Sequence, residues 1–143
     1  MRSYLVKTPG LVQKFFHNYS WRIKTREKEI YLTFDDGPVP DFTPWVLKTL
    51  EEYNAKATFF CVGENIKKHP HIYQQIKEAK HSIGNHTFNH LQGWKTPTNK
   101  YVKNILKAES YLQDASDKQG TKLFRPPHGR IRPLQAKILR KKG

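Results

Sequence analysis

Thr33-Phe34-Asp35-Asp36-Gly37-Pro38 is the stretch that decides the fold. It follows a short apolar run, Ile30-Tyr31-Leu32, which has the alternation and branched side chains of a buried strand. Gly37 and Pro38 end that strand, because Pro38 has no amide donor and Gly37 tolerates almost any backbone angle. Two adjacent carboxylates are therefore expected at the carboxyl end of a strand, where α/β proteins bind ligands. The alternative for Asp-Asp-Gly alone is a solvated turn.

Apolar runs and helical periodicity alternate along the rest of the chain. Further strands are expected at residues 57–62, 81–85 and 122–124, and helices from the Thr43 N-cap, from Pro70, over residues 99–117 and from Pro133. The inward-facing residues are expected to be Val46, Leu47, Leu50 and Tyr53 in the first helix, Ile72, Tyr73, Ile76 and Ala79 in the second, and Val102, Ile105, Leu106 and Leu112 in the third. This alternation predicts an α/β fold with a parallel sheet.

The composition predicts one basic domain. The 143 residues include 26 basic and 12 acidic side chains, which give a net charge of +14 and favour anionic partners such as acidic envelope polymers, anionic lipids or nucleic acid. The alternative is a solvated basic surface without a dedicated partner. No nucleic-acid-binding motif accompanies the charge, so no nucleic acid is expected as a partner. Cys61 is the only cysteine, which excludes an internal disulfide, and its apolar surroundings predict a buried side chain.

Residues 1–28 are interpreted as an N-terminal lead-in. They contain neither a signal-peptide pattern nor an apolar stretch of transmembrane length. The cytoplasm is therefore the default expectation for localisation, with envelope association left open.

Two histidines, His86 and His90, lie four residues apart and follow a predicted strand, as Asp36 does. A parallel sheet would bring the three side chains to one edge, where two imidazoles and one carboxylate suit Zn²⁺ or another divalent metal and leave a position open for water. The alternative for a histidine pair alone is a chance surface arrangement. A third stretch, Phe124-Arg125-Pro126-Pro127-His128-Gly129, also follows a strand and fixes a guanidinium that can pair with a carboxylate.

In this order, the three stretches resemble the motifs of the polysaccharide deacetylases that share the NodB homology domain. The resemblance covers residues 29–143 and implies that Asp35 is the catalytic base and that Asp36, His86 and His90 bind a divalent metal, with Zn²⁺ as the first candidate and Co²⁺ as a second. It also implies that Arg125 belongs to the catalytic machinery and that the loop after it, Pro126, Pro127, His128 and Gly129, lines the substrate groove. The family more often has Tyr where this chain has His128.

The resemblance implies a distorted (β/α) barrel, here incomplete, because the later motifs of the family and its general-acid histidine would lie beyond Gly143. The implied activity is metal-dependent removal of N-acetyl groups from N-acetylglucosamine units in chitin oligomers, peptidoglycan or a related glycan. Two alternatives remain: a catalytically impaired domain that binds metal or glycan, and a basic nucleic-acid-binding protein.

Overall fold

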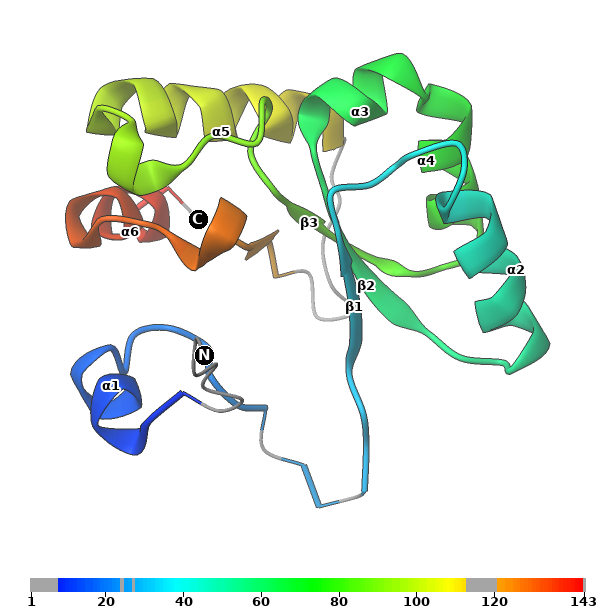
Figure 1. Cartoon of the computed structure of the whole chain (residues 1–143), viewed down its shortest axis with the longest axis horizontal. Helices are drawn as coiled ribbons and strands as arrows, with labels where there is room; N and C mark the ends of the chain where they lie inside the picture. Colours follow the sequence, from blue (N-terminus) through cyan, green and yellow to red (C-terminus); the bar gives the residue numbers. More distant parts are fainter. Residues whose placement is uncertain (1–7, 24, 27, 113–120, 143) are drawn as a thin grey trace, which may run out of the picture. The chain divides into compact units, whose positions relative to one another are not determined.

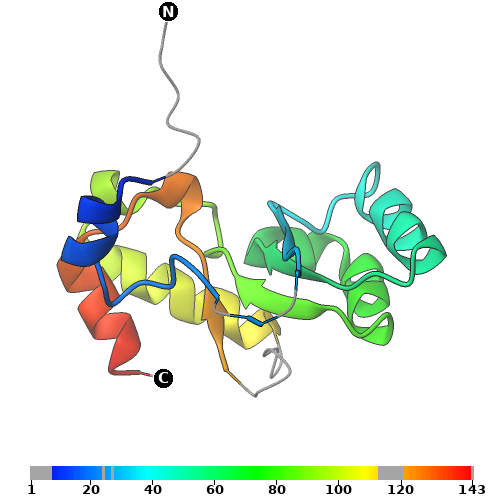
Figure 2. The same ribbon diagram turned by 90° about the horizontal axis from the view of Figure 1, so that it is seen from below.

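A computed structural model describes residues 8–23, 25–26, 28–112 and 121–142 of the chain. The chain forms two compact units, Met1–Ile30 and Tyr31–Gly143. Figure 1 shows the ribbon of the whole chain, and Figure 2 shows it turned by 90°. Among the described residues, no helix combines the length and the apolar character needed to cross a membrane.

Among its described residues, the first unit contains one short helix, α1 (Gly10–Phe15), which buries none of its residues. Its C-terminal side is held by a local aromatic cluster. Trp21 donates a hydrogen bond from Nε1 to the carbonyl of Phe16 at 2.8 Å, and the ring of Tyr19 packs edge-on against both aromatic rings.

The second unit is built on a four-stranded parallel sheet. The strands β1 (Leu32–Asp35), β2 (Ala57–Cys61), β3 (Ser82–Asn85) and β4 (Leu123–Phe124) lie side by side in chain order. The register sets Asp35 level with Phe60 and, across β2, Phe60 level with Gly84. All four carboxyl ends therefore point to the same edge of the sheet, as the alternating sequence pattern predicted.

The connections between the strands are mainly helical. The helices are α2 (Thr43–Glu52), α3 (Gly63–Lys68), α4 (Pro70–Glu78), α5 (Thr98–Leu112) and α6 (Pro133–Arg140), with short 3₁₀ turns η1 (Gly93–Lys95) and η2 (Pro127–Gly129). They form a row in which α2 contacts α4, α4 contacts α3, α3 contacts α5 and α5 contacts α6. In both views α2 and α4 lie at one end of this row and α5 and α6 at the other (Figures 1 and 2).

Strand alternation divides the sheet into an apolar face and a polar face. On the helix-covered face, Phe59, Cys61 and Ile83 form one buried cluster with side chains from α2, α3, α4 and α5. Asp35 and Phe60 point to the opposite face, because successive strand residues alternate. This second face carries the polar side chains described below.

Several helix and strand details differ from the sequence predictions. The first strand begins at Leu32, opposite the first residue of β2, so Ile30 and Tyr31 precede the paired region. All three residues of the expected buried run, Ile30, Tyr31 and Leu32, are exposed. Thr43 is the first helical residue rather than the N-cap, and its Oγ1 accepts a hydrogen bond from the Val39 amide. Tyr53 is exposed because it follows the last residue of α2.

Two further differences concern the later helices. Leu106 is exposed, since the buried side of α5 runs through Tyr101, Val102, Ile105, Ala108 and Leu112. Residues 113–117 of the predicted helix lie outside the described residues. The helix α3 was not predicted, because six residues with one well-buried apolar side chain, Ile66, are too few for a periodic pattern.

Candidate metal centre and active site

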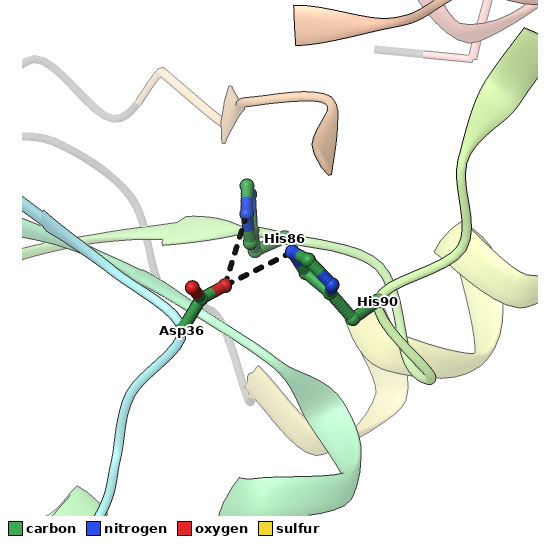
Figure 3. Close-up of side chains that lie close together, drawn as sticks. All are labelled: Asp36, His86 and His90. Carbon is green, nitrogen blue, oxygen red and sulfur yellow. Dashed lines mark ion pairs between the residues drawn. The ribbon is translucent and has the colours of Figure 1, made fainter. Parts of the chain in front are cut away.

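Asp36, His86 and His90 converge at the carboxyl edge of the sheet (Figure 3). Oδ1 of Asp36 lies 3.4 Å from Nε2 of His86 and 3.0 Å from Nε2 of His90. One ligand atom from each residue lies within 4.8 Å of the other two. The structure thus brings together the three residues that the sequence predicted as metal ligands.

The tautomer of His86 makes this arrangement suitable for a cation. Nδ1 of His86 lies 2.7 Å from the carbonyl oxygen of Arg125, an acceptor, so the ring proton belongs on Nδ1. The lone pair of Nε2 then faces the carboxylate of Asp36, and two electron-rich atoms at 3.4 Å repel unless a cation or a proton lies between them. In a tetrahedral zinc site with bonds of about 2.0–2.1 Å, neighbouring ligand atoms are about 3.3–3.4 Å apart. The Asp36–His86 separation matches this spacing and the Asp36–His90 separation of 3.0 Å is shorter, while two imidazoles and one carboxylate are ligand types that suit a divalent metal.

Burial keeps His86 in the form that a metal needs. The residue is 2% exposed, and desolvation lowers the pKa of its imidazole. The Arg125 carbonyl and the carboxylates of Asp35 and Asp36 act in the opposite direction, but burial is the larger effect. A neutral imidazole is the ligand form of histidine.

Asp36 is held in a left-handed backbone conformation, with φ of 67°. The amide side chain of Asn65 donates a 2.7 Å hydrogen bond to its carbonyl, and the Val62 amide donates to the carbonyl of Gly37 at 2.9 Å. Aspartate adopts this conformation more readily than most residues. The junction between β2 and α3 therefore fixes the position of the carboxylate.

The loop that carries both histidines is also strained. Thr87, fully buried, has φ of 66°, an outlier for a β-branched residue. Its amide donates to Oδ1 of Asn85 at 2.8 Å, and its Oγ1 accepts from the Leu91 amide at 3.0 Å. Contacts outside regular structure thus maintain the backbone that aims His86 and His90.

The side chain of Asn104, on α5, holds the same loop through hydrogen bonds. Its Oδ1 accepts hydrogen bonds from the amides of Phe88 at 2.8 Å and Asn89 at 3.2 Å, and its Nδ2 donates to Oδ1 of Asn89 at 2.9 Å. Asn104, Asn85 and Thr87 were not predicted as site residues from the sequence. A polar residue on a helix carries no local signal for a loop fourteen or more residues earlier.

Asp35 and Arg125 form the second part of the site. Nη1 of Arg125 donates to Oδ1 of Asp35 at 2.7 Å and to Oγ1 of Thr33 at 2.9 Å. The guanidinium also lies over the ring of Phe60, 4.1 Å from its centroid. The expected pairing of Arg125 with a carboxylate is therefore present, and the partner is Asp35.

The loop after Arg125 reaches the metal ligands. Pro127 is buried, while His128 is exposed and its ring meets that of His90 edge-on, with the centroids 4.9 Å apart. The amides of Gly129 and Arg130 donate to the carbonyls of Pro126 and Pro127. His128 has φ of 56° and Gly129 has φ of 67°, so the turn is left-handed at both residues.

Comparisons with known proteins identify the family of this chain. The sequence model described as polysaccharide deacetylase matches residues 22–143. A peptidoglycan-N-acetylglucosamine deacetylase of Bacillus cereus is 37% identical over 124 residues, 87% of this chain and 57% of that protein. A chitooligosaccharide deacetylase of Azorhizobium caulinodans is 38% identical over 108 residues, 76% of this chain and 51% of that protein.

A solved structure of a deacetylase also matches this chain. The crystal structure of the Bc1960 peptidoglycan N-acetylglucosamine deacetylase, in complex with a hydroxamate-type benzamide, superposes with a TM-score of 0.74 and 38% identity over 82% of this chain and 54% of that one. The chain spans about half the length of the curated relatives it matches. The predicted α/β fold, an incomplete barrel of the deacetylase type, is confirmed. The boundary predicted between residues 28 and 29 stays a prediction. The chain belongs to the polysaccharide deacetylase family.

Proposed function

We propose that this chain carries the metal-binding and base-bearing part of a deacetylase that hydrolyses the N-acetyl group of N-acetylglucosamine units in a glycan. The observation that carries the proposal is the position of Asp35, which is paired with Arg125 and precedes Asp36 at the same strand end. Relatives named as peptidoglycan and chitooligosaccharide deacetylases support an N-acetylated glycan as the substrate.

Asp36, His86 and His90 would hold the metal, with Zn²⁺ as the first candidate and Co²⁺ as the second, because imidazole and carboxylate ligands suit both. When bound there, the metal supplies Lewis acidity, which polarises the acetamide carbonyl and acidifies water. The Arg125 carbonyl holds the proton of His86 on Nδ1 and so keeps Nε2 available as a ligand.

Asp35 is proposed as the general base. Its Oδ1 is engaged by Arg125, which orients the carboxylate, and Oδ2 can accept a proton from the attacking water. The water oxygen then bonds to the acetamide carbon, and the carbon–nitrogen bond breaks as the proton taken up by Asp35 passes to the departing nitrogen. The products are the sugar amine and acetic acid, which ionises to acetate. General acid–base catalysis of this kind contributes about 10²–10⁴-fold to the rate.

The substrate loop is proposed to stabilise the negative charge that develops on the carbonyl oxygen. The resemblance to the family implies that a backbone amide near His128 is the donor, and the neighbouring amides of Gly129 and Arg130 are engaged within the turn. Pro126 and Pro127 restrict the loop backbone, so a donor there would be preorganised.

Metal titration and acetate release test the proposal together. The chain should bind about one Zn²⁺, and His86→Ala and His90→Ala should each weaken binding at least about a hundredfold, since each removes one of three ligands. His71→Ala, which removes an exposed imidazole from α4, is the matched control and should leave affinity unchanged.

The two aspartates separate binding from turnover. Asp35→Asn should keep the metal and lose most acetate release from N-acetylglucosamine oligomers, whereas Asp36→Asn should lose both. Equal metal loss in the two variants would reverse the assigned roles. Tight metal binding by the unmodified chain without acetate release would instead support a metal- and glycan-binding domain without turnover.

A further inference from the structure

Two loops run outward from the metal ligands in contact with each other. The rings of His90 and His128 meet at 4.9 Å, and three residues after His90 the amide of Gly93 donates to the Arg130 carbonyl at 2.9 Å. The next residue, Trp94, donates from its indole Nε1 to the carbonyl of Ile131 at 3.1 Å. The paired loops therefore form one continuous surface that begins at the site.

Trp94 presents an open aromatic side chain on this surface. The residue is 57% exposed, although its ring nitrogen is bonded and its carbonyl accepts a 2.6 Å hydrogen bond from Nη2 of Arg132. The Arg130 guanidinium lies over the ring, 5.5 Å from its centroid. An indole fixed in this way offers a flat apolar area at little cost in side-chain entropy.

The two arginines next to the indole have no acidic partner among residues 8–23, 25–26, 28–112 and 121–142. Both are exposed, and no carboxylate of the described chain lies within ion-pair distance of Arg130 or Arg132. Guanidinium groups bind carboxylates through paired hydrogen bonds, so this surface is suited to an anion of that kind.

A buried glutamine holds the platform rigid. Gln135, fully buried at the start of α6, donates from Nε2 to the carbonyls of Gly93 and Thr96 and accepts from the Arg132 amide with Oε1. A Cβ on Gly93 would lie 2.5 Å from the Arg130 carbonyl, so only glycine permits this close approach. These contacts fix the backbone positions of Trp94, Arg130 and Arg132 relative to one another.

We propose that Trp94, Arg130 and Arg132 form an outer subsite that binds a carboxylate-bearing sugar unit of an N-acetylated glycan, next to the unit held at the metal centre. The pyranose ring packs on the indole, and its carboxylate meets the two guanidinium groups. Trp94 lies four residues after His90, so the Cα atoms of the two residues are at most about 14 Å apart. A sugar unit next to the one at the metal centre can therefore reach Trp94. The inference rests on the proposed function.

Equilibrium binding to two glycans tests the subsite. The probes are a neutral N-acetylglucosamine oligomer and a peptide-free peptidoglycan strand of equal length, whose muramic acid units carry lactyl carboxylates. All proteins carry Asp35→Asn so that hydrolysis does not interfere, and thermal unfolding checks that each variant folds. Without further changes the acidic strand should bind more tightly, by a margin that shrinks as salt rises.

The variants separate charge from stacking. Arg130→Gln/Arg132→Gln should weaken binding of the acidic strand about tenfold, as two exposed charge pairs permit, and of the neutral oligomer less than about twofold. Arg130→Lys/Arg132→Lys should keep most of the preference. Lys77→Gln/Lys80→Gln, which removes two charges near the start of β3, is the control and should change neither affinity. Trp94→Ala should weaken both.

Several outcomes would overturn the inference. One is that the Arg130→Gln/Arg132→Gln variant and its parent bind the acidic strand with equal affinity. A second is that this variant loses the same amount of affinity for both glycans. A third is that the parent binds neither glycan. Tighter binding of a single-stranded DNA oligonucleotide, lost in the same double variant, would assign the surface to nucleic acid instead. Acetate release is measured separately with Asp35 intact, so selective binding without turnover would contradict only the proposed function.

Discussion

The backbone carbonyl of Arg125 accepts a 2.7 Å hydrogen bond from Nδ1 of His86. The guanidinium of the same arginine pairs with Asp35 at 2.7 Å. One residue therefore orients a candidate metal ligand through its main chain and the candidate base through its side chain. Because the two contacts use different parts of the residue, mutation can separate them.

Arg125→Met should leave metal binding nearly intact while removing turnover. The substitution keeps the carbonyl that orients His86 and an apolar chain against Phe60, but Asp35 loses its partner. Zinc affinity should stay within about threefold, while acetate release falls about a hundredfold, the loss expected from a misplaced catalytic group. Arg125→Lys keeps a positive charge but lacks the planar guanidinium, so its rate of acetate release should lie between those of the unmodified chain and Arg125→Met. Loss of zinc affinity in Arg125→Met would show that the side chain also supports the metal centre.

Asn104→Ala should loosen the histidine loop without touching a ligand. The side chain makes three hydrogen bonds to Phe88 and Asn89, so its removal leaves two loop amides without their acceptor and costs about 1–3 kcal/mol of stability. Zinc affinity should fall about tenfold, the lower end of the range for supporting residues. Asn99→Ala, at an exposed position on the same helix, is the matched control. An unchanged zinc affinity in Asn104→Ala would mean that the loop holds its shape without this anchor.

Much of the candidate site could be predicted because parallel topology decides it. Asp36, His86 and Arg125 each follow a strand end, and the carboxyl ends of parallel strands share one edge, so no side-chain detail is needed to place them together. The contacts that orient these side chains cannot be predicted from the local sequence. Asn104 reaches the loop only because α5 has one particular rotation. The strained conformation of Thr87 is held by the Asn85 side chain and by the remote Gly63 amide, which donates to the Thr87 carbonyl at 3.0 Å.

The failed fold predictions have a related cause. Ile30 and Tyr31 look like strand residues, but the first strand is limited by where β2 begins, and that partner is remote in sequence. Leu106 fits a helical stripe as well as its neighbours do, yet the stripe that faces the core is set by how α5 packs on β3 and α3. Tyr101, fully buried at the start of α5, was missed for the same reason.

Stability should fall as the pH drops below about 6.5, partly because of His81. Burial is the main reason that the pKa of His81 lies below its ordinary value of 6.5, and Lys56 adds to the effect. Between the folded pKa and 6.5 the unfolded chain binds more protons, so this contribution is complete above pH 6.5 and is lost as the pH falls toward the folded pKa. His81→Gln cannot titrate, so its melting temperature should drop less between neutral pH and about pH 5 than that of the unmodified chain. Parallel curves for the two proteins would contradict this origin.

Cys61 should be unreactive until the protein unfolds. The side chain is fully buried in the core cluster, and burial raises the pKa of its thiol to about 12. Since the thiolate is the reactive form, a disulfide reagent at neutral pH should label the native protein negligibly and the denatured protein completely. The labelling rate then measures opening of the core. Rapid labelling of the native chain would show that β2 is accessible in solution.

Gly84→Ala should disturb the candidate active site from a neighbouring strand, on the face of the sheet that carries Asp35 and Phe60. A Cβ at Gly84 would lie 2.5 Å from Cδ1 of Phe60 and 3.0 Å from Cβ of Leu123, so the Phe60 ring has to move. That ring supports the guanidinium of Arg125 at 4.1 Å, and its displacement shifts the partner of Asp35. We expect a stability loss of about 1–3 kcal/mol from overpacking, together with reduced acetate release at unchanged zinc affinity. Gly10→Ala, where a Cβ meets no atom within 4 Å, is the matched control and should change none of these quantities. Full activity with normal stability in Gly84→Ala would mean that the Phe60 ring repacks without moving Arg125, which would separate the glycine from the catalytic pair.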